Sequence, residues 1–147
     1  MSSIDFEEKF RSTGLEPGDE VGLRQLIKST ASRELLLSLI YIYGYSYPRN
    51  EEILLICDRY IRKKIPGLTA VCMRVALDYW RVISDYLETI EKFLDVELVD
   101  DWYDEVIFCA NFVERHKDEI DFPNSILDKC RIIRNNKRFI KLLSIEL

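Results

Sequence analysis

The stretch Ser84-Asp-Tyr-Leu-Glu-Thr-Ile-Glu-Lys-Phe-Leu94 decides the fold class of this sequence. Its apolar residues recur three or four positions apart, and charged residues occupy the positions between them. This spacing matches the 3.6-residue turn of an α-helix. The stretch therefore predicts an amphipathic helix that packs one face on a core, through Tyr86, Leu87, Ile90, Phe93 and Leu94.

The same period recurs on both sides of this stretch, whereas no segment alternates with the two-residue period of a strand. Leu35–Tyr43 is apolar on nearly all sides, as expected of a helix buried between others. The sequence thus predicts an all-α chain. We expect helices over 4–12, 19–30, 33–45, 51–64, 68–82, 85–95, 102–118 and 125–144.

Short polar side chains mark the helix boundaries. Asn135-Asn136 is a candidate break inside the last predicted helix, because asparagine favours turns. Side chains that accept hydrogen bonds from the first turn of a helix precede three of the apolar stripes. The candidate N-caps are Asn50, Ser84 and either Asn124 or Ser125.

A helical pattern also repeats along the chain. Aligning 39–43, 75–79 and 109–113 gives separations of 36 and 34 residues. A helix-turn-helix unit that recurs at this spacing is typical of an α-solenoid. We therefore expect one domain over 1–147, a short α-solenoid of about three to four helix-turn-helix repeats, with segment 19–30 and the end of the chain as caps.

Residues Gly67–Trp80 followed by Ser84–Leu94 resemble a degenerate HEAT repeat. Val75-Ala76-Leu77 and Cys109-Ala110-Asn111 occupy the family's Val-Ala-Ala-like site, while Asp104-Glu105-Val106-Ile107 keeps only part of its Asp…Val-Arg turn. The resemblance covers about residues 19–140 and implies stacked helix pairs. It speaks to architecture more than to function.

Composition bounds the class of protein. The chain has 147 residues, of which 48% are hydrophobic and 32% charged, as in a globular domain with a core. A net charge of −5 and a pI near 5.0 weigh against nucleic-acid binding. Met1–Glu8 has no features of a secretory signal, and no apolar run reaches the ~20 residues of a membrane span. We expect a cytoplasmic protein that does not enter a membrane.

Residues that could carry catalysis or bind a metal are scarce. Cys57, Cys72, Cys109 and Cys130 form no C-x-x-C pair and are predicted to be core thiols. The single histidine, His116, ends a charged helix and is predicted to be solvated there. Phosphate-binding, dinucleotide-binding and zinc-protease motifs are absent from the sequence. The sequence predicts no enzyme, no cofactor and no metal site.

Charge is strongly segregated. Between Ser84 and Glu105 nine acids accompany one base, Lys92, for a local charge of −8. From Lys129 to Lys141 six bases face no acid, so the two signs are expected at opposite ends of the repeat array. No base follows closely enough in the sequence to balance Asp95 to Glu105, and a patch of this kind steers a cationic partner. An ordinary solvated face is the alternative.

Aromatic residues border this acidic run and also cluster earlier in the chain. Trp102 and Tyr103 are candidate interface anchors, although Trp102 packed under the next helix is the alternative. Tyr43 is expected to pack inward, with Tyr45 and Tyr47 in a turn after Gly44. Core and loop packing explains these tyrosines, or they form an aromatic rim that contacts a partner.

A small, acidic HEAT-like protein without catalytic residues is similar to the helical immunity proteins of bacterial toxin systems. This resemblance implies tight one-to-one neutralisation of a basic, nuclease-type toxin domain, by a protein that is a monomer when free. The alternatives are an adaptor that docks onto a housekeeping enzyme complex and a nucleic-acid-binding solenoid that uses Lys129–Lys141. The predicted partner-binding residues are Asp85, Glu88, Glu91, Asp95, Glu97, Asp100, Asp101, Trp102, Tyr103, Asp104 and Glu105.

Overall fold

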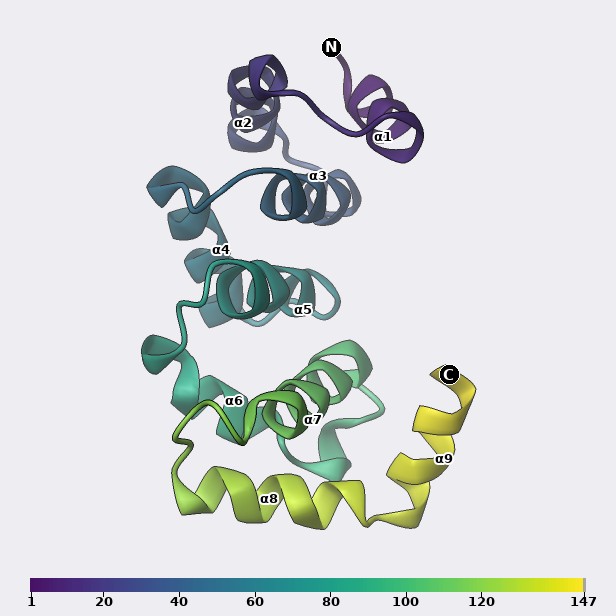
Figure 1. Ribbon diagram of the computed structural model, residues 1–147. Coiled ribbons are helices and arrows are strands. Elements are labelled where there is room, and N and C mark those ends of the chain that lie inside the picture. Colours follow the sequence, from purple (N-terminus) through teal and green to yellow (C-terminus); the bar gives the residue numbers. More distant parts are fainter. Residues whose placement is uncertain (147) are drawn as a thin grey trace. The chain divides into compact units, whose positions relative to one another are not determined.

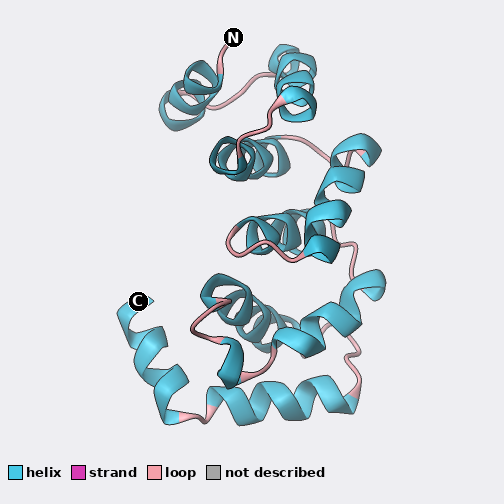
Figure 2. Cartoon of the chain, turned by 180° about the vertical axis from the view of Figure 1, so that it is seen from behind, coloured by secondary structure: helices cyan, strands magenta, loops and turns pink. Residues whose placement is uncertain are grey.

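A computed structural model describes the backbone of residues 1–146 and the side chains of residues 1–142. Over the described residues the chain is helical and contains no strand (Figure 2). The predicted all-α class is therefore confirmed. The chain divides into two compact units, Met1–Arg81 (unit 1) and Val82–Leu147 (unit 2), which are described separately below.

Unit 1 is organised around its third helix. Its elements are α1 (Ser3–Ser12), the 3₁₀ turn η1 (Pro17–Asp19), α2 (Glu20–Ser29), α3 (Arg33–Ser46), α4 (Glu51–Lys63), α5 (Leu68–Met73) and the π-helix η2 (Arg74–Tyr79). α3 contacts α1, α2 and α5, and α4 packs on α5 (Figure 1). α3 buries most of its apolar residues, as its composition predicts, although Leu35 and Leu37 are exposed.

Gly44 lies inside α3, where it allows a close approach to η2. A Cβ atom on Gly44 would lie 2.5 Å from Cγ2 of Val75, a distance that real Cβ contacts do not reach. The helix expected over 33–45 is close to α3, but the turn expected directly after Gly44 is wrong, because this glycine serves packing and α3 continues to Ser46. Tyr45 is consequently helical, whereas Tyr47 follows the helix as its C-cap and Tyr43 packs inward as predicted.

The predicted helix over 68–82 ends early, in a π-turn. The backbone N–H of Trp80 donates to the carbonyl of Val75 at 2.9 Å, five residues earlier. The indole Nε1 of Trp80 then donates to the carbonyl of Tyr47 at 3.1 Å. This second bond ties the end of η2 to the end of α3.

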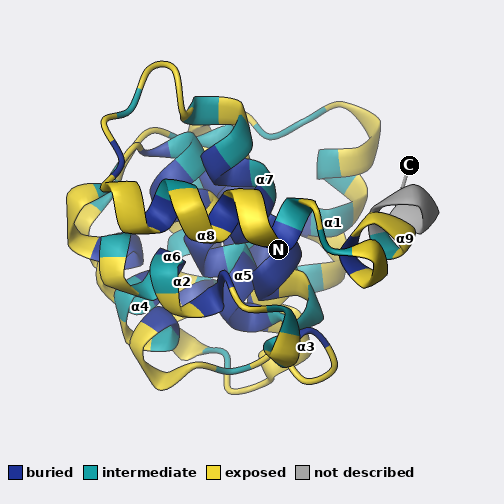
Figure 3. Cartoon of the chain, turned by 90° about the horizontal axis from the view of Figure 1, so that it is seen from below, coloured by how far each residue is buried: buried dark blue, intermediate teal, exposed yellow. Residues whose placement is uncertain are grey.

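Unit 2 packs three helices together and adds a fourth. It contains η3 (Ser84–Tyr86), α6 (Leu87–Phe93), η4 (Val96–Leu98), α7 (Tyr103–His116), α8 (Asn124–Arg134) and α9 (Lys137–Glu146). α6, α7 and α8 contact one another, and α9 contacts α8. Buried and exposed residues alternate along α8, the pattern of a helix with one face on the core (Figure 3).

The candidate break at Asn135-Asn136 is confirmed, because α8 and α9 are separate helices. Oδ1 of Asn136 accepts a hydrogen bond from the backbone N–H of Arg138 at 2.9 Å, and so caps α9. Asn50 caps α4 as predicted, through a bond from the backbone N–H of Ile53 at 3.1 Å.

The other predicted N-caps are wrong. Neither α6 nor α8 has a side-chain cap, and their N-cap residues are Tyr86 and Pro123. Ser125 instead donates its hydroxyl to Glu91. Its side chain thus links α8 to α6, which is a tertiary contact that sequence spacing does not report.

The core contains the four cysteines, as predicted. Cys57 and Cys72 lie in unit 1 and Cys109 and Cys130 in unit 2, and all four are buried as free thiols. Burial raises the pKa of the Cys109 thiol well above its ordinary value. These residues act as small apolar side chains of the core.

Candidate functional site

The strongest candidate surface is an acidic segment that connects α6 to α7. Five of its carboxylates are exposed, namely those of Asp95, Glu97, Asp100, Asp101 and Asp104. We call these five residues the acidic segment. Its backbone winds through η4 and into the first turn of α7, where acidic side chains also stabilise the helix dipole.

The acidic segment has a basic neighbour that the sequence did not reveal. Arg138 of α9 forms an ion pair with Asp100. The prediction that no base lies within reach of Asp95 to Glu105 is therefore wrong. The helix is interrupted at Asn135-Asn136, and the first turn of α9 then lies beside Asp100 of the acidic segment.

The acidic and basic runs also do not lie at opposite ends of the molecule, because both belong to unit 2. Lys129 of α8 pairs with Glu91 of α6 at 3.4 Å. Ser125 donates a hydrogen bond to the same carboxylate at 2.6 Å, and these contacts, the Ser125 bond foremost, lower the pKa of Glu91. Glu91 is half-buried and is part of the α6–α8 packing.

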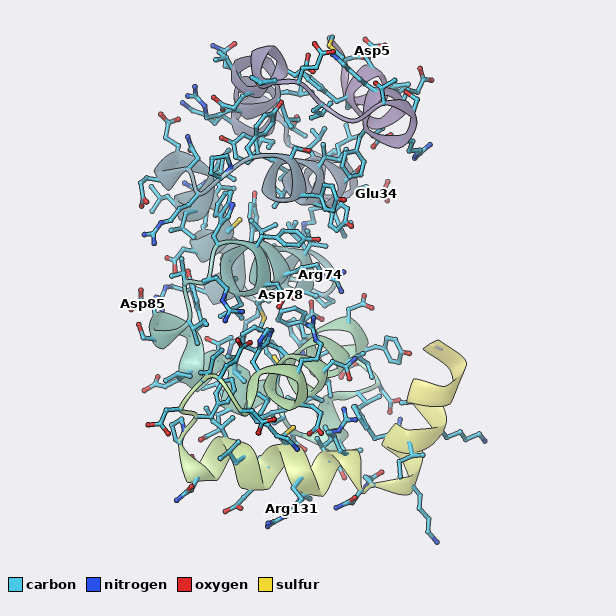
Figure 4. All side chains as sticks on the ribbon, in the orientation of Figure 1. Asp5, Glu34, Arg74, Asp78, Asp85 and Arg131 are labelled. Carbon is cyan, nitrogen blue, oxygen red and sulfur yellow. The ribbon has the colours of Figure 1, made fainter. Side chains whose placement is uncertain are left out.

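Asp85 and Glu88 are separated from the acidic segment. Asp85 lies on η3, which precedes α6, whereas Asp95 follows α6 (Figure 4). Seven residues of helix, about 10 Å of rise, stand between those two ends. Both Asp85 and Glu88 are exposed, but they form a second acidic position rather than an extension of the first.

Glu105 is not on the surface. Its side chain is fully buried in α7, and it contributes to raising the pKa of Cys109, one turn further along. The spacing of the sequence indicates this burial, because Glu105 precedes Cys109 by four residues and Val113 by eight. All three residues therefore lie on the buried face of α7. Glu105 therefore offers a partner no accessible surface.

The two aromatic residues beside the acidic segment are half-buried. The ring of Trp102 lies 5.5 Å from that of Phe93 of α6, centroid to centroid. Trp102 thus packs partly on the preceding helix while it keeps some exposed surface beside Asp101. Tyr103 opens α7 next to it. Aromatic residues of this kind can add contact area to an acidic patch.

The net charges of the two units support this location of the site. Unit 2 contains 15 acidic and nine basic side chains, a net charge of −6, whereas unit 1 has a net charge of +1. Within the acidic segment, the described residues place an ion pair on Asp100 and on no other member. The remaining four carboxylates give unit 2 its concentrated negative field.

The single histidine is engaged in local contacts. His116 is the last residue of α7, and its ring lies 4.7 Å from that of Phe112 and pairs with Glu119. It is half-buried rather than fully solvated as predicted. Among the described residues, no group of three or more His, Cys, Asp or Glu side chains could hold a metal ion.

A second surface is an aromatic cluster in unit 1, where the sequence left an aromatic rim open as the alternative to core and loop packing. Tyr41 and Tyr45 lie four residues apart on α3, and their rings are stacked with centroids 6.3 Å apart. Phe10 of α1 and Tyr79 of η2 complete the cluster. The four-residue spacing of the two tyrosines is the signal that could have placed them on one helix face.

Comparison with known proteins identifies no relative of this chain. No protein-family model matches the chain, and neither the curated proteins nor the solved structures contain a significant match. None of the helices in the described residues is long and apolar enough to cross a membrane.

Proposed function

We propose that this chain is a binding protein, without catalysis of its own, whose acidic segment receives a basic protein. The observation that carries the proposal is the row of exposed carboxylates over Asp95–Asp104. Such a row attracts a cationic surface over a distance and selects against acidic proteins. Trp102 and Tyr103 would supply apolar contact at its edge.

We further propose that the partner is a toxin domain, of a basic nuclease type, which this chain neutralises one-to-one in the cytoplasm. In such a complex the carboxylates of the acidic segment would pair with the cationic groups that the toxin uses to hold phosphate. The aromatic residues would close the interface against water. Neutralisation of this kind is steric and electrostatic and needs no catalytic group.

We include in the same proposal a repeat architecture built from helix pairs. α3 packs on α5 and η2 in unit 1, and α6 packs on α7 and α8 in unit 2. These helix pairs are compatible with HEAT-like repeats, and we propose that the chain is a short solenoid related to the helical immunity proteins. The support for this step is the residue spacing together with the helix pairs inside each unit.

The first test is a capture experiment from native cytosol with the tagged full chain, at low and at high salt. One small basic protein, retained one-to-one and lost as salt rises, is the expected result. That protein must also be toxic when it is expressed alone and harmless when it is co-expressed with this chain. Recovery of a large housekeeping assembly would support the adaptor alternative instead.

Charge reversal locates the interface. Asp101→Lys with Asp104→Lys should abolish capture, because both carboxylates are exposed in the acidic segment. The matched control is Asp118→Lys with Asp121→Lys, which makes the same change of net charge elsewhere in unit 2 at exposed positions. Equal loss in both variants would show a general charge effect and would reject the acidic segment as the site.

A further inference from the structure

In the aromatic cluster of unit 1, the rings of Phe10 and Tyr79 each contact both Tyr41 and Tyr45. The ring of Phe10 meets Tyr45 edge-on at 5.3 Å and Tyr41 edge-on at 6.1 Å. The ring of Tyr79 approaches Tyr45 edge-on at 6.1 Å. Tyr45 is nevertheless 63% exposed, so a large part of its ring has no cover from the described residues.

A surface pocket opens beside these rings. It encloses about 630 Å³ and is lined by Phe10, Ser12, Thr13, Gly14, Leu15, Tyr41, Tyr45 and Ser46. This volume falls in the range of small-ligand sites, roughly 300–1,000 Å³. No lining residue bears a formal charge.

Two hydroxyls of the pocket donate their hydrogens to the protein itself. The hydroxyl of Ser12 donates to the carbonyl of Glu8 at 2.9 Å, and that of Thr13 donates to the carbonyl of Gly14 at 3.3 Å. Since these hydrogens are already used, both oxygens present lone pairs to a ligand.

The ring of Tyr79 packs beside Tyr45 and is not part of the pocket lining. Burial and a hydrogen bond with Tyr41 raise the pKa of Tyr79 to about 12, so the Tyr79 phenol keeps its proton. The bond between these two hydroxyls is internal to the cluster. The rings therefore present mainly their π-faces and edges, and the negative potential of an aromatic face attracts cations.

The backbone favours the same sign of charge. The lining residues Ser12 and Thr13 end α1, and Tyr45 and Ser46 end α3, so the pocket lies at the carboxyl ends of two helices. Helix C-termini carry partial negative charge. The nearby Lys9 does not fill the pocket, because its ammonium pairs with Asp19 at 2.7 Å.

We propose that this pocket is a binding site for an organic cation, an ammonium or guanidinium group held against the π-faces of Phe10, Tyr41 and Tyr45 and by the acceptor oxygens around them. An anion would meet the π-faces and the carboxyl ends of two helices, which both disfavour negative charge. The site is independent of the acidic segment, so either proposal can fail alone.

The experiment is an NMR titration of the ¹⁵N-labelled full chain. The cationic probes are Nα-acetyl-arginine amide, Nα-acetyl-lysine amide and choline. The neutral controls of similar shape are Nα-acetyl-citrulline amide and 3,3-dimethylbutanol. Cations should shift the amide signals of Thr13, Gly14, Tyr45 and Ser46, and neutral isosteres should bind about tenfold more weakly.

The probes also separate two sources of the cation. Preference for the amino-acid amides indicates a side chain of a protein partner, whereas preference for choline indicates a free quaternary ammonium compound. Both results support a cation site.

Variants distinguish the pocket from a general surface effect. Tyr45→Leu should weaken cation binding about tenfold, and Tyr45→Phe should retain it because the π-face remains. Leu55→Ala is the matched control, since Leu55 of α4 is 64% exposed and does not line the pocket. A dispersed spectrum for each variant verifies folding.

Three results would overturn the proposal. Equal affinity for the neutral isosteres would identify an apolar pocket, and tighter binding of acetate would give it the wrong sign. The absence of pocket shifts up to the solubility limit of all three cations would show that no such site exists.

Discussion

Arg138 of α9 pairs with Asp100, 38 residues earlier in the chain, and so brings a positive charge into the acidic segment. The arginine side chain is 50% exposed and the aspartate side chain 75%. An ion pair this exposed contributes little to stability, about 1 kcal/mol or less. Its larger effect is on the local field of unit 2, which it partly screens.

Removal of this screening should speed partner association. In Arg138→Gln, the partner recovered by capture should associate faster than with the wild-type chain at low salt, and at the same rate at high salt. Stopped-flow fluorescence at two salt concentrations measures both rates. Arg131→Gln makes the same change of charge on α8, away from Asp100. If it accelerates association equally, the Arg138 contact has no special role.

Gly44→Ala should destabilise unit 1 even though alanine favours helix by about 1 kcal/mol. The added methyl would lie 2.5 Å from Cγ2 of Val75, and overpacking of this kind costs about 1–3 kcal/mol. Urea unfolding gives the loss.

The double variant Gly44→Ala with Val75→Ala tests the cause. Its loss should be smaller than the sum of the two single losses, because the second truncation makes room for the new methyl. Strictly additive losses would contradict the proposed clash.

Low pH should reduce the stability of unit 1, because it protonates Glu20. Hydrogen bonds from Arg24, foremost, and from Tyr43 lower the pKa of Glu20 below its ordinary value of 4.5. The stabilisation is complete above that ordinary value and is lost as pH falls through the lowered pKa. Glu20→Gln should therefore cost more stability at neutral pH than in acid. Urea unfolding at both pH values measures the difference, and an equal cost would contradict it.

Tyr43→Phe examines the same contact from the other side. The Tyr43 hydroxyl donates to Oε2 of Glu20 at 2.8 Å, and the Tyr43 ring is buried. Hydrogen bonds to charged groups contribute about 1.5–3 kcal/mol, so a loss of that order is expected at neutral pH. Tyr45→Phe is the control, since Tyr45 is exposed, and it should change stability little.

The four thiols should be unreactive in the folded chain. The Cys72 thiol contacts Cys57, and that contact together with burial raises its pKa, while burial alone dominates at Cys109. Thiolates are the reactive form, so Ellman's reagent should release almost no colour at neutral pH and four equivalents after unfolding in urea. Rapid reaction of any thiol in the folded state would show that the unit holding it opens readily.

Periodicity in the sequence predicted the helices well, because each one buries a regular apolar stripe. It also marked the break at Asn135-Asn136. It could not predict the direction that α9 takes after this break, because the contact of Arg138 with Asp100 depends on tertiary packing. The absence of a nearby base in the sequence was therefore a poor guide to the charge around the acidic segment.

Two errors arose where a local rule met a tertiary requirement. Gly44 looked like the start of a turn, but α3 needs a residue without a side chain there to pass Val75 and continues to Ser46. Glu105 looked like part of an acidic surface, although its spacing from Cys109 placed it on the buried face. Reading Tyr45 as a turn residue followed from the first error and separated it from Tyr41, on which its ring stacks.

The π-turn of η2 determines in which direction around the helix axis the side chains of Tyr79 and Trp80 point. A π-helix holds one residue more than the α-helix that would span the same length. If the same six residues formed an α-helix instead, Tyr79 and Trp80 would be turned by about 100° around the helix axis. The indole of Trp80 would then leave the carbonyl of Tyr47, and the ring of Tyr79 would leave its place beside Tyr41. The π-turn thus holds both of these contacts between η2 and the end of α3 at once.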